Sequence, residues 1–158
     1  MMTRYVIVQN GAVVTVFGGP QPVDTAGYEE LAETDALWVA YLLAQAQASQ
    51  TVILKTACDA AITGGFSAAA LGAAYTYPSA ATDQANLAQT AAAAGGGMLM
   101  CESAANVWSL VAHTQTQAQT VLAAFIAWRD KQRQQLATLI AEVAAAATPA
   151  LVAAIVWP

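Results

Sequence analysis

Ionisable side chains are scarce in this sequence, and their scarcity limits the chemistry that the chain can perform. Charged residues make up 9% of the 158 residues, against roughly 25% in an ordinary globular domain. Acid–base catalysis needs a titrating group held beside its substrate, and His113 is the sole histidine. Glu102 is the only acid that we can place near it, and satisfying backbone groups is the simpler role for this histidine. We therefore expect no catalytic residue and no enzymatic activity.

Metal ligands and phosphate-binding loops are equally sparse. The two cysteines, Cys58 and Cys101, and the single histidine lack the spacing of a zinc site. The acidic stretch 29–35 lacks the pattern of a calcium loop, and Gly95–Gly97 lacks the lysine and hydroxyl residue of a phosphate loop. We expect no metal and no cofactor. For the two cysteines we expect buried free thiols, which suit a reducing compartment.

Positive charge is too sparse for binding to nucleic acid or to an anionic membrane. The net charge is −5, whereas affinity for phosphate backbones needs a basic stripe. Arg129, Lys131 and Arg133 cluster, but Asp130 lies among them and a solvated helix face explains the group. The longest apolar run near the front, 36–44, is far shorter than the ~20 residues that span a bilayer. No signal-peptide pattern is visible, so we expect a soluble, cytoplasmically made protein.

Apolar residues are abundant where charged residues are scarce. They make up 58% of the chain, and much of the excess over an ordinary composition is alanine. A surface so poor in charge leaves apolar patches, and such patches mark interfaces with other proteins. The alternative is a surface covered by glutamine, threonine and serine. We favour the interface.

Two β-hairpins are predicted. In Arg4–Phe17, two runs of β-forming residues flank Asn10–Gly11, a pair typical of the type I′ turn. The glycines and prolines of 18–27 then predict a linker. The second hairpin pairs Met98–Cys101 with Asn106–Val111. A lone hairpin is marginally stable in water, so the first must pack on the rest of the chain, on a symmetry mate or on a partner.

Apolar residues at three- and four-residue spacing predict two long helices. The first runs from a cap at Thr34 or Asp35 to Ile62, and the second runs from Thr114 to about Ala146. We expect a turn or short helix at 28–34 before the first of them. A short helix is also expected from a cap at Thr82 or Asp83 to about Ala94, and another from Thr148–Pro149. Residues 66–77 are undecided apart from an extended segment before Pro78.

These elements predict an α+β, mainly α fold. It consists of an N-terminal β-hairpin and two long helices that flank a short helix and a second small β-hairpin. We divide the chain into a hairpin and linker at 1–27 and a mainly helical domain at 28–158.

The remaining special side chains suit protein docking. Trp38 and Trp128 lie on helical stripes and are expected in the core. Trp157 is the penultimate residue, where chains usually fray, so it anchors either the core or a partner. An edge of the N-terminal hairpin can also extend a partner's sheet by strand addition. The residues that we predict to bind a partner are Tyr5, Ile7, Val14, Val16, Arg129, Arg133 and Trp157.

Several short motifs occur in a specific order along the chain. They are Gly64–Phe66 (GGF), Ala70–Gly72 (ALG), Tyr75–Ser79 (YTYPS), Asp83–Leu87 (DQANL), Trp108, His113–Gln115 (HTQ) and Ile155–Pro158 (IVWP). This order resembles a domain of unknown function found in bacteriophage tail proteins. The N-terminal part, with Asn10–Gly11 and the stretch leading to Trp38, resembles the leader of tail-fibre assembly proteins.

The resemblance implies a non-enzymatic protein that binds the phage tail fibre and assists its folding, trimerisation or attachment as an assembly chaperone. The alternative is a structural virion component of the tail fibre or baseplate. The implied partner is the fibre protein, with this chain present as a homo-oligomer or in several copies per fibre. Neither nucleic acid nor a membrane is expected as a partner. The chaperone would act in the host cytoplasm during assembly, and the virion component would stay in the tail.

Overall fold

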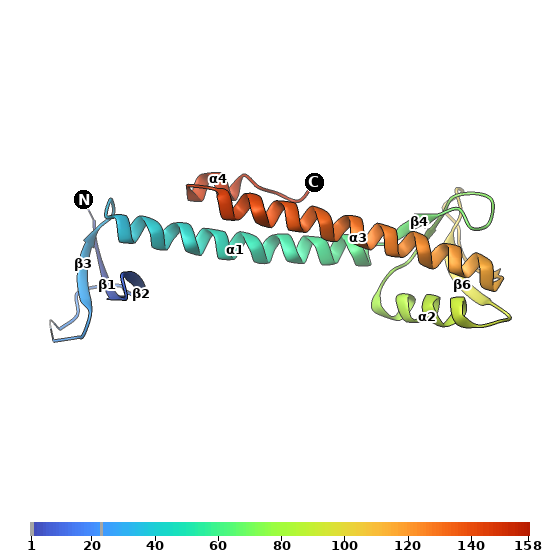
Figure 1. Cartoon of the computed structure of the whole chain (residues 1–158), viewed down its shortest axis with the longest axis horizontal. Coiled ribbons are helices and arrows are strands. Elements are labelled where there is room, and N and C mark those ends of the chain that lie inside the picture. The colour runs from blue at the N-terminus through green and yellow to red at the C-terminus, as the bar shows by residue number, and fades with distance from the viewer. Residues whose placement is uncertain (1, 23) are drawn as a thin grey trace. The chain divides into compact units, whose positions relative to one another are not determined.

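The computed structural model describes residues 2–22 and 24–158 (Figure 1). Residue 23, within the predicted linker, lies outside the described residues. The chain divides into two compact units. Unit 1 holds the residues up to Val52 together with Ala141–Val156 and Pro158, and unit 2 holds Ile53–Ile140 and Trp157.

Unit 1 contains an antiparallel sheet of three strands in the order β2-β1-β3. The strands are β1 (Thr3–Gln9), β2 (Ala12–Phe17) and β3 (Tyr28–Ala32). The predicted turn is confirmed, because Asn10 and Gly11 have φ angles of 51° and 74°. The prediction of a turn or helix at 28–34 is wrong for β3, which pairs with β1 and so satisfies the open edge of the hairpin.

Helix α1 (Ala36–Thr63) begins in unit 1 at the predicted place. The carboxylate of Asp35 accepts a hydrogen bond from the Leu37 N–H at 2.8 Å, which satisfies one of the unpaired donors at the helix start. Trp38 lies in a buried cluster with Val6 and Leu31. The first turns of α1 therefore cover the face of the sheet that carries Val6.

The C-terminal part of unit 1 is held by glutamines of α1. Helix α3 (Gln115–Ala145) has no basic residue in its last turn. Gln47 Nε2 instead donates to the carbonyl oxygens of Val143 and Ala146, at 3.1 and 3.3 Å. Gln50 Nε2 donates to the Ile155 carbonyl at 2.6 Å. These amides supply donors to carbonyl groups at the end of a helix and in the following tail, where intrahelical donors run out.

Unit 2 contains an antiparallel sheet of four strands in the order β4-β5-β6-β7. Helix α2 and the greater part of α3 belong to the same unit, and Phe125 of α3 contacts Phe66 of β4 with ring centroids 5.3 Å apart. The buried core includes Cys58, Leu87, Leu99, Cys101 and Val121. The elements are β4 (Phe66–Ala68), β5 (Tyr75–Tyr77), α2 (Ala81–Ala92), β6 (Gly97–Glu102) and β7 (Trp108–His113).

The predicted fold class is wrong in its β content. The described residues are about 49% helix and 23% strand, and they form two antiparallel sheets of three and four strands in an α+β fold. The chain is therefore not mainly α with two isolated hairpins. Each predicted hairpin gains strands on an open edge, because unpaired backbone groups there would otherwise depend on water: β3 joins β1, and β5 with β4 joins β6.

Other local predictions hold. The second hairpin is confirmed as β6–β7, paired from Gly97 opposite His113 to Glu102 opposite Trp108. Both long helices are confirmed, and α4 (Pro149–Ala153) begins after Thr148, whose side chain accepts from the Leu151 N–H. The division that we placed between 1–27 and 28–158 falls between β2 and β3, two strands of one sheet.

Candidate functional site

The N-terminal residues that we predicted to bind a partner do not form one surface. Tyr5 and Ile7 lie half-buried on β1, the central strand, on the face opposite buried Val6. Val16 pairs directly with Val6 and so shares its face. Val14 is 52% exposed and is left over where the register between β1 and β2 shifts. The structure thus distributes these side chains over both faces of the sheet.

The predicted residues of the C-terminal half also differ in their surroundings. Arg129 is paired with its neighbour Asp130, with Nη2 3.1 Å from Oδ1. Arg133 is exposed on α3. Trp157 is half-buried and packs against the core of unit 2. Of the two roles open to this tryptophan, the structure shows that of an anchor in the chain's own core.

His113 is buried and both of its ring nitrogens have partners. Nδ1 lies 2.9 Å from the carbonyl oxygen of Val111, which can only accept, so Nδ1 carries the proton. In the neutral ring, Nε2 then accepts from the Tyr77 hydroxyl at 2.9 Å. Burial raises the pKa of Tyr77 to about 12, with smaller contributions from Cys101 and Tyr75. The pair satisfies buried polar groups, as expected for this histidine.

Glu102 does not accompany His113. It lies opposite Trp108 at one end of the β6–β7 ladder, whereas His113 lies opposite Gly97 at the other end. The turn between α2 and β6 brings Gly96 so close to the His113 carbonyl that a Cβ atom would lie 2.0 Å from it. Only glycine fits that position, where φ is 68°.

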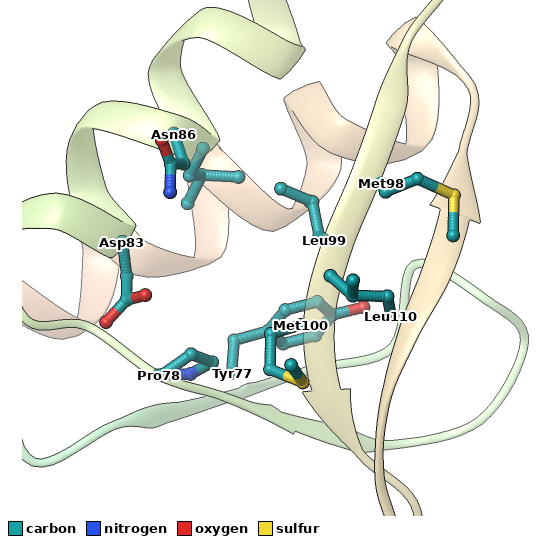
Figure 2. Close-up of a pocket in the computed structure, with 9 residues that line it drawn as sticks. Tyr77, Pro78, Asp83, Asn86, Met98, Leu99, Met100 and Leu110 are labelled. Atoms are coloured by element: carbon teal, nitrogen blue, oxygen red, sulfur yellow. The ribbon is translucent and has the colours of Figure 1, made fainter.

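A groove of about 290 Å³ opens in unit 2 between α2 and strands β6 and β7 (Figure 2). Figure 2 shows Asp83 and Asn86 projecting from α2 on one side, with Met100 and Leu110 on the other. The carboxylate of Asp83 accepts from the Ala80 N–H at 3.1 Å, which fixes its position at the helix start. The lining residues are Tyr77, Pro78, Asp83, Asn86, Leu87, Met98, Leu99, Met100 and Leu110.

The groove adjoins an exposed apolar surface, which we call the outer face: Met98, Met100, Trp108 and Leu110. Residues directly opposite in an antiparallel pair share one face, and Met98 lies opposite Ala112 while Met100 lies opposite Leu110. The four outer-face side chains are 54%, 40%, 48% and 58% exposed. The intervening residues of β6 point to the core, so this sheet is apolar on both sides.

Sequence reasoning missed the outer face, although a signal was present. Residues 98–101 are four consecutive apolar residues on a predicted strand, MLMC. A strand at the surface buries only every second side chain. An apolar run with no alternation therefore predicts large apolar side chains on both faces of the strand.

A second groove, of about 420 Å³, lies in unit 1 between the β1–β2 turn and α1. Its lining mixes Val13, Val14, Leu37 and Tyr41 with alanines and Gln45. It is larger, but the exposed valines of β2, Val14 and Val16, are only two and are smaller than the methionines, tryptophan and leucine of the outer face. The groove in unit 2 is therefore the better candidate.

The stretch of sequence that forms the second sheet and α2 carries charge of one sign. No lysine or arginine occurs between Lys55 and Arg129, whereas Asp59, Asp83 and Glu102 fall in that stretch. Glu102 lies opposite Trp108 on the outer face, and Asp83 lines the groove. The site therefore combines apolar contact with carboxylates and has no basic group of its own in this stretch.

The described residues contain no group of three or more histidine, cysteine or acidic residues placed to hold a metal ion. No helix in the part of the chain that the structure describes is long and apolar enough to cross a membrane. Cys58 and Cys101 are buried free thiols, as predicted, and burial raises the pKa of both. No protein-family model, curated protein or solved structure matches the chain.

Proposed function

We propose that this chain is a non-enzymatic protein that binds a phage tail fibre through unit 2 and assists its folding, trimerisation or attachment. The outer face of the β6–β7 hairpin is the observation that carries the proposal. Its side chains are large, adjacent and exposed, and they exceed what the core of unit 2 needs. Contiguous apolar surface of this kind is typical of a protein interface.

The chemistry of the outer face suits a partner that changes shape during assembly. Methionine is unbranched and flexible, and it adapts to varied apolar surfaces. Met98 and Met100 flank the buried Leu99 on β6, so their side chains are free to repack while the strand is held by the core. Trp108 adds a rigid aromatic side chain, a residue type enriched where binding energy concentrates.

The resemblance to phage tail proteins supplies the partner in this proposal. Tail-fibre association explains why a chain with so few charges keeps exposed apolar groups: a fibre would cover them during or after trimerisation. The experiment is co-expression of the chain with the tail-fibre protein of the same phage, followed by affinity capture through a tag on this chain.

The decisive comparison uses two leucines of nearly equal exposure. Leu110 on the outer face is 58% exposed, and Leu151 on α4 is 56% exposed. Full burial of a leucine contributes roughly 1.5–3 kcal/mol, so Leu110→Ser is expected to weaken fibre binding by about tenfold. Leu151→Ser should leave binding unchanged. Equal capture of fibre by both variants, or no capture by the unaltered chain, would refute the proposal.

The proposal also makes a statement about the virion. An assembly chaperone leaves its client, so purified particles should lack stoichiometric amounts of this chain. Mass spectrometry of purified virions measures this directly. Recovery of the chain in a fixed ratio to the fibre would instead identify a structural component of the tail.

A further inference from the structure

Sheet edges expose unpaired backbone groups, and three of the four edge strands in the described sheets carry a protective feature. β4 has only three residues, Phe66–Ala68. β3 exposes the acidic side chains of Glu29 and Glu30. β2 is interrupted where Val14 has no direct partner on β1. Short length, charge and bulges are the features by which proteins prevent edge pairing.

β7 has none of these features. Its six residues, WSLVAH, include no proline and no acidic, lysine or arginine residue. It pairs with β6 at all six positions without a shift in register. Five of the six residues are exposed or half-exposed, and His113 alone is buried. The strand therefore presents a regular and open edge.

The register shows which backbone groups face outward. The Ser103 N–H donates to the Val107 carbonyl at 3.1 Å, next to the ladder. Hydrogen-bonded and non-bonded pairs alternate along an antiparallel ladder, so every second residue of β7 directs its backbone groups toward β6. The N–H and C=O groups of Trp108, Leu110 and Ala112 consequently point to the free edge.

We propose that β7 binds an extended segment of another protein as an added fifth strand, and that this segment carries alternating apolar residues and at least one lysine or arginine. This rests on the proposed function only in that unit 2 docks a protein. Strand addition satisfies the outward backbone groups. It also places alternate side chains of the partner beside Trp108 and Leu110, as a continuation of the outer face.

Charge selects the occupant. Between Lys55 and Arg129, the aspartates and Glu102 are acidic and no lysine or arginine occurs. A cation on the added strand lies beside the exposed ring of Trp108, and Glu102 follows on the same face one strand further, opposite Trp108. The ring and the carboxylate both attract a lysine or arginine. A second copy that paired through its own β7 strand, WSLVAH, would bring no lysine or arginine on the added strand. The occupant is therefore a different chain with basic character.

The test uses a displayed library of random peptides about twelve residues long, selected against the full chain. Ala112→Pro removes one outward N–H without removing a bond to β6, and Ala112→Thr is the matched control that keeps it. We expect selected peptides with alternating β-branched or aromatic residues, a lysine or arginine, and no proline. They should bind Ala112→Pro about tenfold more weakly than Ala112→Thr.

Equal binding to both variants, absence of enrichment, or enrichment of acidic or proline-rich peptides overturns strand addition. A second measurement holds even if Ala112→Pro does not fold. Hydrogen exchange at the amides of Trp108, Leu110 and Ala112 should slow when a selected peptide binds the unaltered chain, and unchanged exchange overturns the inference. A dimer that disappears on Leu110→Ser would overturn it in favour of a second copy. Fibre capture without protection of these amides leaves the proposed function standing and refutes strand addition alone.

Discussion

The two sheets of this molecule are both antiparallel, yet they differ in what they present to solvent. In unit 1, the face opposite Val6 carries half-buried Tyr5, Ile7, Phe17 and Tyr28 together with Thr15 and Glu30. In unit 2, the outer face carries methionine, tryptophan and leucine, while the inner face forms the core. The large side chains on that face of the first sheet are half-buried. Those on the outer face of the second sheet are exposed, so the second sheet has more apolar surface open to a partner.

The comparison of the two sheets shows which feature points to a docking surface in a chain with few charges. Apolar content alone does not locate it, because alanine raises that content throughout the sequence. What distinguishes the outer face is the position of large side chains on a strand whose other side is already buried. Those side chains are exposed and lie outside the core of unit 2, which supports the proposed docking role.

The greatest loss of folding stability is expected on the buried side of β6, and a neighbouring residue on its exposed side is the control. Leu99 is 6% exposed and Met98 is 54% exposed. Leu99→Ala should lower the free energy of unfolding by about 2–5 kcal/mol, because it leaves a cavity in the core. Met98→Ala should change it by less than about 0.5 kcal/mol. Urea unfolding measures both, and similar losses would mean that the outer face is needed for folding after all.

A smaller effect is expected from the buried Tyr77–His113 pair, which has no counterpart in the sheet of unit 1. Tyr77→Phe leaves His113 Nε2 without its donor, at an expected cost of about 1–3 kcal/mol. The pKa of Tyr77 is raised to about 12, so the folded state holds this proton more tightly than the unfolded state. Its stabilising contribution is complete below pH 10 and is lost as pH rises through about 12.

The alkaline part of this prediction is checked by urea unfolding at several pH values. The unaltered chain should lose stability more steeply above pH 10 than Tyr77→Phe does. Burial also raises the pKa of the thiols of Cys58 and Cys101, and both proteins share those losses. The difference between the two slopes therefore isolates Tyr77, and identical slopes would show that its hydroxyl is not held as the structure has it.

The smallest loss of stability is expected for a glutamine of α1 that donates hydrogen bonds to backbone carbonyls in unit 1. Gln47→Ala removes the donor to the carbonyls at the end of α3 and should cost about 0.5–1.5 kcal/mol. Gln45→Ala, at an exposed position on the same helix, should cost less than about 0.5 kcal/mol. Thermal unfolding followed by circular dichroism compares the pair. A larger loss for Gln45→Ala would contradict this assignment.

Local signals in the sequence were sufficient for elements that form from neighbouring residues. The Asn10–Gly11 turn, both long helices and the β6–β7 hairpin were predicted for the physical reasons that the structure shows. The prediction failed at β3, left β4 undecided, and gave extended backbone but no pairing at β5. β4 and β5 offer little signal, because they have three residues each, too few to show a periodicity. Their pairing joins distant segments, as where Thr76 lies opposite Glu102.

The candidate site was harder to predict because it depends on which face of a strand is buried. The order Met98–Cys101 does not say whether methionines or their neighbours face the core. Packing of α3 against the sheet decides this, by placing Leu99 and Cys101 with Phe125. The sequence likewise does not decide whether Trp157 faces the core, because this depends on the path of the C-terminal tail.

The most direct test of the central claim uses the methionines as reporters. The chain has four, and Met98 and Met100 lie on the outer face whereas Met2 lies in unit 1. With methyl-labelled methionine, addition of the tail-fibre protein should shift or broaden the Met98 and Met100 signals and leave that of Met2 unchanged. Fibre binding that perturbs Met2 and not the outer-face pair would contradict the assignment of this surface.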